Sequence, residues 1–345
     1  GSWSQLGSDI DGEAAGDQSG YSVSLSSDGT TLAIGAPQAG ASTNGHVRVY
    51  QYSSGSWSQL GSDIDGEAIV DKSGHSVSLS SDGTIVAIGA PRNFIEDKGH
   101  VRVYQYSSGS WSQLGSDIDG ETTGDYSGYS VSLSSDGTIV AIGAPYNGDS
   151  NKGNVRLFQF SSGSWSQLGS EIVGSNGGDE AGYRVSLSSD GRTVAVGAPF
   201  NDDSGDNAGQ VRVFKYNGTA WAQLGSDIDG EVAVDYSGVS VSLSSDGTTL
   251  AVGANANDDS GDKAGHVRVY KYNGTAWVQL VSDIDGESVG DQSGWNTLSS
   301  DGTKVAIGAH RAHDNDKGHV RVFNLVKNAP VAVADVLTVD EDASL

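Results

Sequence analysis

The chain has 345 residues, with 50 glycines but only 5 prolines and no Gly-X-Y period, so a collagen-like structure is excluded. Its 19 basic and 44 acidic residues give a net charge of −25, which opposes binding to a nucleic acid backbone. There is no cysteine, which excludes disulfides, thiolate metal sites and cysteine nucleophiles. No apolar run is long enough to insert into a membrane as a helix.

Four strands are predicted in the first repeat, in chain order. Residues 21–27 alternate between polar and apolar, an SSDG turn follows, and residues 30–37 form a mostly apolar strand. After a variable loop, residues 46–52 alternate again, and a short turn leads into a fourth strand that contains Trp57. Helical periodicity is absent, so the pattern indicates an all-β unit.

Six copies of this unit follow one another along the chain. The segment GSWSQLGSDIDGE opens the chain and returns in exact or drifted form, which places a marker tryptophan at Trp3, Trp57, Trp111, Trp165, Trp221 and Trp277. The spacings of 54 to 56 residues are in the range of propeller blades. The sequence therefore predicts a six-bladed β-propeller of four-stranded antiparallel blades.

The two ends of the chain complement each other. Residues 2–7 read as a fourth strand without its first three, and residues 319–325 read as a third strand without its fourth. We expect the N-terminal strand to pair in the last blade and close the ring, which would remove the exposed edges. Residues 1–326 are thus predicted as the propeller, and residues 327–345 as a linker and truncated start of another module. Because the sequence starts inside a repeat, we expect a monomeric piece of a longer polypeptide.

Positions that recur in every copy are candidates for scaffold. Asp28 and its equivalents lie in the SSDG turn, where a carboxylate accepts hydrogen bonds from turn amides. A strand arginine recurs in every repeat and is expected to be partly buried and to need an anionic partner. We predict that it pairs with the aspartate that precedes the first strand of each repeat. The arginines are Arg48, Arg102, Arg156, Arg212, Arg268 and Arg321, and the aspartate series begins with Asp17.

Dense carboxylates in the loops are candidate Ca²⁺ ligands, because they repel one another unless a cation or arginine intervenes. Solvated acidic loops are the alternative interpretation. The candidates in the DIDGE segments are Asp9, Asp11, Glu13, Asp63, Asp65, Glu67, Asp117, Asp119, Glu121, Asp227, Asp229, Glu231, Asp283, Asp285 and Glu287. Those in the loop between strands two and three are Asp202, Asp203, Asp206, Asp258, Asp259 and Asp262. No organic cofactor is expected.

A third group of positions varies between the copies. In a propeller, the loops between strands four and one and between strands two and three emerge on one face, which is the candidate binding surface. The candidate ligand-face residues are Tyr21, His75, Tyr129, Tyr183, Trp295, His310 and His313. The last repeat has also lost one residue from its first strand, which should shift the register or remove a bulge.

The repeated motifs resemble FG-GAP repeats, the blades of integrin α-subunit heads and of bacterial surface proteins. The shared pattern is Ser19–Val23, Leu32–Pro37 and Gly45–Tyr50. The resemblance implies an extracellular propeller that binds partners through one face, often with Ca²⁺. Two features depart from integrin heads: SSDG has one carboxylate where those blades have a DxDxDG-like loop, and six blades are counted instead of seven. Residues 327–345 similarly resemble the first strand of a cadherin-like Ig module.

From these observations the expected function is a non-enzymatic adhesion module, secreted or on the cell surface, that recognises a protein or glycan through its loop face. The alternatives are a propeller lectin with sugar sites between blades, and a structural spacer without ligand. No nucleophile elbow, HExxH motif or phosphate-binding loop indicates an enzyme. The strand tryptophans are expected to pack between blades.

Overall fold

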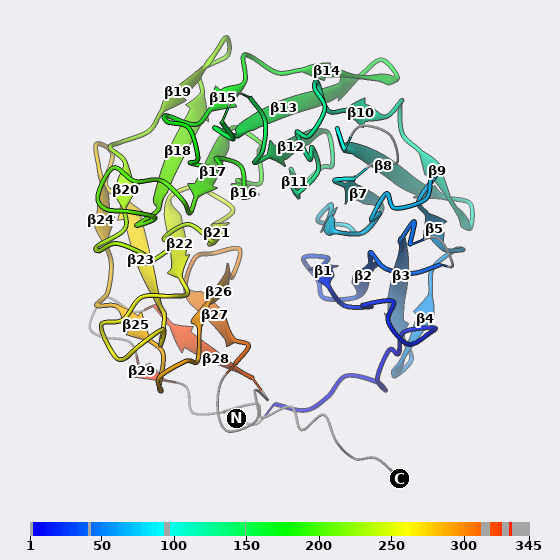
Figure 1. Cartoon of the computed structure of the whole chain (residues 1–345). Helices are drawn as coiled ribbons and strands as arrows, with labels where there is room; N and C mark the ends of the chain where they lie inside the picture. Colours follow the sequence, from blue (N-terminus) through cyan, green and yellow to red (C-terminus); the bar gives the residue numbers. More distant parts are fainter. Residues whose placement is uncertain are drawn as a thin grey trace. The chain divides into compact units, whose positions relative to one another are not determined.

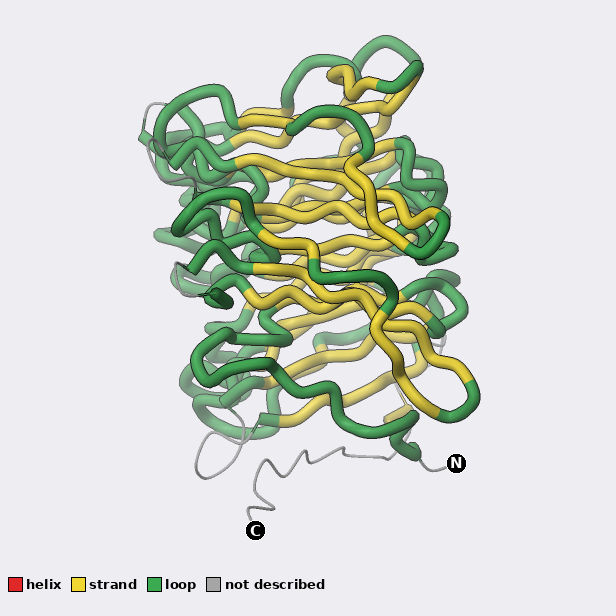
Figure 2. The backbone as a smooth tube through the Cα atoms, turned by 90° about the vertical axis from the view of Figure 1, so that its right-hand side faces the viewer, coloured by secondary structure: helices red, strands yellow, loops and turns green. Residues whose placement is uncertain are grey.

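The computed structural model describes residues 3–40, 43–92, 97–148, 150–311, 318–325 and 331–332. These residues form strands and turns and no helix, so none forms a helix that could cross a membrane. The fold is the predicted all-β, six-bladed β-propeller with antiparallel blades (Figures 1 and 2). The chain divides into two compact units, which are described separately. The first comprises Ser4–Gly191 and Asn217–Trp221, and the second comprises Gly1–Trp3, Arg192–Tyr216 and Ala222–Leu345.

The strands recur in a fixed order in each repeat. The first strands are β1 (Ser22–Leu25), β6 (Ser76–Leu79), β11 (Ser130–Leu133), β16 (Arg184–Leu187), β21 (Ser240–Leu243) and β26 (Ser293–Leu298). The second strands are β2 (Thr31–Ala36), β7 (Ile85–Ala90), β12 (Ile139–Ala144), β17 (Thr193–Ala198), β22 (Thr249–Ala254) and β27 (Lys304–Ala309). The third strands are β3 (His46–Ser53), β8 (His100–Ser107), β13 (Asn154–Ser161), β18 (Gln210–Tyr216), β23 (His266–Tyr272) and β28 (His319–Asn324).

The remaining strands complete the sheets. The fourth strands are β4 (Ser56–Gln59), β9 (Ser110–Gln113), β14 (Ser164–Gln167), β19 (Trp221–Gln223), β24 (Trp277–Gln279) and β29 (Val331–Ala332). Two-residue strands β5 (Ile64–Asp65), β10 (Ile118–Asp119), β15 (Ile172–Val173), β20 (Ile228–Asp229) and β25 (Ile284–Asp285) pair with the third strands β3, β8, β13, β18 and β23. The sequence analysis missed these short strands because two residues are too few to show a period.

The expected strand exchange at the chain ends is wrong. The fourth strand of the last blade is β29, which pairs with β28 through Phe323 and Ala332. Residues 3–7 form no strand. Because β29 lies close to β28 in the sequence, their pairing costs less chain entropy than bringing in the opposite end of the chain. Apart from β29, residues 327–345 lie outside the described residues.

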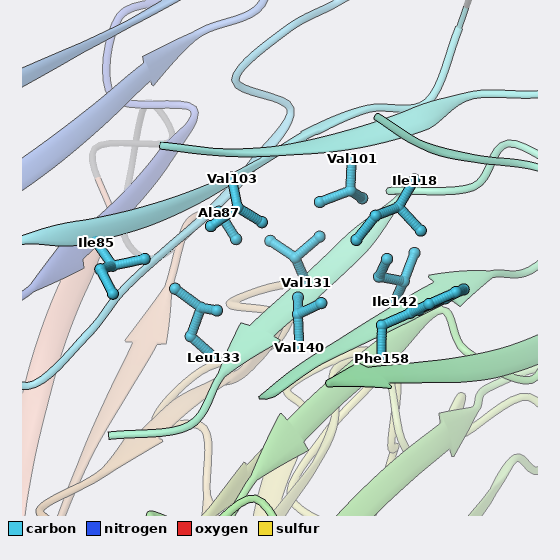
Figure 3. Packing of buried hydrophobic residues seen from close by; sticks show 10 residues of the cluster. All are labelled: Ile85, Ala87, Val101, Val103, Ile118, Val131, Leu133, Val140, Ile142 and Phe158. Carbon is cyan, nitrogen blue, oxygen red and sulfur yellow. The ribbon is translucent and has the colours of Figure 1, made fainter. Parts of the chain in front are cut away.

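The core consists of apolar side chains packed between neighbouring blades. In the first unit, β7 and β12 are buried along their whole length, as expected for central strands of mostly apolar sequence. Figure 3 shows side chains of blade two, from Ile85 to Ile118, packed against side chains of blade three such as Val131 and Ile142. The burial of these side chains, at about 25 cal/mol per Å², stabilises the contact between the two blades.

The marker tryptophans after Trp3 bond to the preceding repeat, whereas Trp3 itself is 62% exposed. The indole Nε1 of Trp111 donates to the carbonyl of Leu60 one repeat earlier, at 2.7 Å. The same bond at the same length joins Trp165 to Leu114. Each indole therefore fixes the register of one repeat against the preceding one.

Five of the recurrent arginines form ion pairs with glutamates and not with the recurrent aspartates, which corrects the expectation for these five. Arg102 donates to the backbone carbonyl of Asp65 at 2.8 Å and forms an ion pair with Glu67 at 3.1 Å. Asp71, of the aspartate series, is buried and its carboxylate accepts a bond from the backbone N–H of Ala68 at 2.7 Å. The Asp71 carboxylate therefore bonds within its own loop, to the amide three residues earlier, and not to the arginine of a strand.

Two local predictions are confirmed. The Asp28 carboxylate accepts bonds from the Ser26 hydroxyl at 2.7 Å and the Thr30 N–H at 2.9 Å, so it holds the SSDG turn. These bonds lower the pKa of Asp28. In the last blade, the register of β26 against β27 is irregular between Ser293 and Trp295, where the repeat has lost a residue.

Candidate functional site

The candidate site is a cleft of about 590 Å³ in the first unit, and it is built from the same three positions of blades one, two and three. One position lies four residues before the start of each first strand, the second lies immediately before that strand, and the third follows the second strand. In chain order of the blades, the three sets are Gln18, Tyr21 and Gln38; Lys72, His75 and Arg92; and Tyr126, Tyr129 and Tyr146. The two predicted loop series thus meet at one cleft.

The first of these positions has a strained backbone. Gln18, Lys72 and Tyr126 have φ values of 57°, 60° and 54°, in the left-handed region that non-glycine residues rarely adopt. A glycine would relieve this strain, yet each blade carries a large polar side chain here. The same conformation recurs at Glu180, Tyr236 and Gln292, so it belongs to the backbone that all the repeats share.

His75 is the titratable group at the middle of the cleft wall. Its Nδ1 lies 3.2 Å from the backbone carbonyl oxygen of Tyr129, and its Nε2 lies 3.2 Å from the hydroxyl of Tyr21. A carbonyl oxygen can only accept, so Nδ1 carries the hydrogen and Nε2 of the neutral ring accepts from Tyr21. Burial, helped by the cations Arg184, Arg92 and Lys72, lowers the pKa of His75 to about 4. At neutral pH this imidazole is therefore an uncharged base.

Aromatic rings form a continuous row across the blades. Tyr21 and His75 have centroids 5.0 Å apart, His75 and Tyr129 are 4.7 Å apart, and Tyr129 and Tyr183 are 5.0 Å apart. All three pairs are tilted by 47° or 48°, because they occupy equivalent positions of successive repeats. Tyr146 adds an edge contact to Tyr129 at 6.3 Å.

Two cations lie in the cleft of this strongly acidic protein. Lys72 donates from Nζ to the side-chain oxygen of Gln38. Burial, together with Arg92, lowers the pKa of Lys72. Arg92 lies with its guanidinium 5.5 Å from the ring centroid of Tyr126. This pairing of positive charge and aromatic surface suits an anionic ligand with a hydrophobic or sugar-like face.

Glu180, the fourth-repeat counterpart of Gln18, lies beside the cleft. Its backbone N–H donates to the carbonyl of the cleft residue Asn151 at 3.2 Å. Burial raises the pKa of Glu180 to about 7. Burial also raises the pKa of Tyr146 to about 12, and the negative charge of Glu180 adds to that shift.

The predicted ligand-face residues separate into two groups. Tyr21, His75 and Tyr129 line the cleft, and Tyr183 continues their row. Trp295 and His310 belong to the second unit, where Trp295 Nε1 donates to His310 Nδ1 at 3.1 Å. His313 lies outside the described residues.

Lys72, Arg92, Gln38 and Glu180 were missed as candidates from the sequence. A sign was present, since the residue that precedes the recurrent Ser-Gly or Ala-Gly pair differs in almost every copy. The φ of that residue could not be read from the sequence. The expectation of an acidic loop face fails at this cleft, where Lys72 and Arg92 are the charged groups.

Many candidate Ca²⁺ ligands already have partners within the protein. Asp9, Asp63 and Asp117 each accept a bond from a glutamine amide four residues earlier, at 2.6 to 2.7 Å. Asp202 and Asp258 accept from backbone amides of their own loops, Asn207 and Lys263, at 2.7 and 2.6 Å. The recurrent arginines form ion pairs with Glu13, Glu67, Glu121, Glu231 and Glu287.

Within the described residues, two groups bring carboxylates and a histidine close enough to share a metal ion. They are Glu13, His46 and Asp63, and Glu231, Asp259, His266 and Asp283. Both contain a buried histidine at the start of a third strand, a residue type and position that the sequence analysis did not consider as a ligand.

The FG-GAP repeat family model matches residues 117–158, which supports the resemblance found in the motifs. Among curated proteins, no sequence matches this chain. Three solved structures share its fold. A protein from Bacteroides uniformis that is named as a candidate 6-phosphogluconolactonase is 12% identical, with a TM-score of 0.63 over 93% of this chain and 86% of its own. The periplasmic gluconolactonase of Pseudomonas aeruginosa is 17% identical, with a TM-score of 0.62 over 92% and 85%. Hydrazine synthase of Kuenenia stuttgartiensis is 13% identical, with a TM-score of 0.59 over 94% and 80%.

These likenesses correct the expected function. The chain was expected to be a non-enzymatic adhesion module, but the propellers that it resembles carry the names of enzymes, two of them lactonases. The earlier inference relied on the absence of linear catalytic motifs. In a propeller, functional side chains come from separate repeats, so no linear motif is needed to assemble a site.

Proposed function

We propose that the chain is a hydrolase of sugar lactones that carry an anionic group, with the cleft of blades one to three as its active site. The observation that carries this proposal is the neutral His75, which lines the cleft together with two cations and whose Nε2 accepts a hydrogen bond from the cleft residue Tyr21. The lactonase names of two structures with the same fold add support.

His75 is the general base of the proposed reaction. The Tyr21 side chain is 52% exposed, so a water molecule can replace its hydroxyl at Nε2. His75 then takes a proton from this water as the water oxygen bonds to the lactone carbonyl carbon. The hydrogen bond from Nδ1 to the Tyr129 carbonyl holds the ring in the required tautomer.

Lys72 and Arg92 stabilise the negative charge that develops on the carbonyl oxygen, or hold the anionic group of the substrate. The ring C–O bond then breaks, and the alkoxide oxygen takes the proton from His75. The product is one hydroxy acid, formed from one lactone and one water. The tyrosine rings of the cleft supply apolar surfaces for the sugar carbons.

A pH-stat assay tests the proposal, because each hydrolysed lactone releases one proton when the product acid ionises. We expect the protein to accelerate hydrolysis of gluconolactone or 6-phosphogluconolactone above the spontaneous rate, and His75→Gln to abolish the acceleration. Tyr236→Phe is the matched control, since Tyr236 occupies the Lys72 position in blade five. Equal rates with and without protein for both lactones would contradict the proposal, as would full activity of His75→Gln.

A further inference from the structure

A second cluster of titratable side chains lies in the second unit, in blade five. Glu231, Asp259, His266 and Asp283 each offer one ligand atom, and these four atoms all lie within 4.8 Å of one another. His266 begins β23 and is fully buried, with 0% of its surface exposed. The three carboxylates come from the loops around it. The cluster therefore joins three oxygen donors to one imidazole nitrogen.

His266 has no hydrogen-bond partner for either ring nitrogen among the described residues. The nearest anionic contact is Glu231 Oε2, 4.0 Å from Nδ1, which is too long for a hydrogen bond. A buried polar group without a partner costs about 1–3 kcal/mol. An arrangement of this kind needs a partner that the protein itself does not supply.

Each carboxylate of the cluster is held in place by a neighbouring side chain through one oxygen. Glu231 Oε1 faces Arg268 Nη1 at 3.5 Å. Asp283 Oδ1 accepts from the Gln279 amide, and Asp259 Oδ2 accepts from Asn257 at 3.4 Å. The ligand atom that each residue offers to the cluster is a carboxylate oxygen. Metal-binding carboxylates are typically oriented in this way by groups around them.

Blade four provides an internal comparison for the role of His266. Its equivalent residue is Gln210, which begins β18. The Gln210 amide donates from Nε2 to Asp203 at 3.3 Å, to Asp227 at 3.4 Å and to Asp229 at 3.0 Å. Amide hydrogens thus lie between the carboxylates of blade four. At His266 no such donor is present, and the carboxylates face a ring nitrogen instead.

The three carboxylates of the cluster carry like charges and repel one another at these short distances. A cation between the carboxylates and the ring would offset the repulsion and would give a partner to a ring nitrogen that has no hydrogen bond.

We propose that Glu231, Asp259, His266 and Asp283 bind a divalent transition metal ion of the zinc class. An imidazole nitrogen favours such an ion over Ca²⁺, which prefers oxygen donors alone. Four donors match the usual coordination number of Zn²⁺ in structural sites. The site is separate from the cleft and does not depend on the proposed lactonase activity.

Titration calorimetry of the metal-stripped full chain with Zn²⁺ tests the site. We expect one tight site, and we expect His266→Gln, which copies the residue of blade four, to weaken it at least 100-fold. Asp203→Asn in blade four and His46→Gln in blade one should leave the tight site unchanged. Ca²⁺ should not compete with Zn²⁺ at similar concentrations.

Visible absorption with Co²⁺ gives a second measurement, since a protein-bound ion with an imidazole ligand in a four-coordinate site absorbs strongly. The band should appear in the wild-type protein and be absent in His266→Gln. Equal thermal midpoints of the two metal-free proteins would show that the variant folds. The proposal is overturned if the wild-type protein binds no Zn²⁺, or if folded His266→Gln binds it as tightly.

Discussion

Blades two and five have the same backbone but different chemistry. Lys72 of blade two and Tyr236 of blade five have φ values of 60° and 56°. Arg92 and Ala256 both donate their backbone N–H to the carbonyl of the recurrent aspartate, at 3.3 and 3.4 Å. At the position immediately before the first strand, blade two has His75 where blade five has the buried Val239.

The proposed metal site shows the reverse: blade five has it, and among the described residues blade two does not. Blade five combines His266 with Asp259 from its long acidic loop, whereas blade two has a histidine, His100, without that loop. The difference teaches that the repeat determines the backbone positions, and that a few variable side chains determine what each blade can bind.

The largest expected effect comes from His75, the residue that most separates the two blades. His75→Gln removes the general base and should lower kcat/KM for the lactone roughly 100- to 10,000-fold. In the wild-type protein, kcat/KM should fall as the pH drops through about 4, because His75 then becomes protonated. Initial rates across pH measure both effects. A variant that keeps the wild-type rate would remove His75 from the mechanism.

The close backbone approach that blades two and five share leaves no room for a methyl group at Gly89 or Gly253. A Cβ at Gly89 would lie 2.1 Å from the carbonyl oxygen of Gly128, and at Gly253 it would lie 1.8 Å from that of Gly294. Gly89→Ala and Gly253→Ala should each destabilise the protein by about 3 kcal/mol. Chemical denaturation measures the loss.

Gly308 of the last blade is the matched control for these glycines. Because the register of β26 is shifted there, a Cβ at Gly308 would meet its nearest atoms at 3.6 Å, an ordinary contact. Gly308→Ala should therefore change the stability by less than about 1 kcal/mol. A similar loss in all three variants would mean that the close backbone approach is not the cause.

The cations of blade two should set substrate affinity more than rate. Arg92→Gln and Lys72→Met each remove a charged hydrogen-bond donor, and we expect KM for a phosphorylated lactone to rise about 10- to 100-fold. For the uncharged lactone the rise should be smaller if these residues hold the phosphate. Steady-state kinetics with both substrates distinguish this role from stabilisation of the oxyanion, which would lower kcat for both.

The smallest expected effect is a change in how stability depends on pH. Because the pKa of His75 is lowered in the folded protein, the free energy of unfolding should decrease as the pH falls from about 6.5 to 4. Because the pKa of Glu180 is raised, the free energy of unfolding should decrease as the pH rises from about 4.5 to 7. The two trends oppose each other in the wild-type protein.

Single variants should separate these trends. In His75→Gln only the trend from Glu180 remains, so the thermal midpoint should fall as the pH rises from about 4.5 to 7. In Glu180→Gln only the trend from His75 remains, so the thermal midpoint should rise as the pH rises from about 4 to 6.5. Midpoints measured across this range check both slopes. Parallel curves for the two variants would contradict the assigned pKa shifts.

The sequence was sufficient to predict the fold because six copies repeat the same alternation, turns and tryptophans. It also grouped Tyr21, His75 and Tyr129, which line one cleft in the structure, because their position varies between copies. It could not place Lys72 and Arg92 beside His75, because they lie in different loops of one blade and their proximity depends on backbone conformation. The pairing at β28 was predicted wrongly because both chain ends carried strand-like sequence.

The bonds from each tryptophan to the preceding repeat have a consequence for how the repeats can be exchanged. Since every repeat presents the same leucine carbonyl, one repeat can replace another without loss of these indole bonds. The row from Tyr21 through His75 to Tyr129 has no such tolerance, because each ring contacts a particular neighbour. Duplication or exchange of repeats would thus preserve the architecture while interrupting the cleft, so the candidate site depends on the order of the blades.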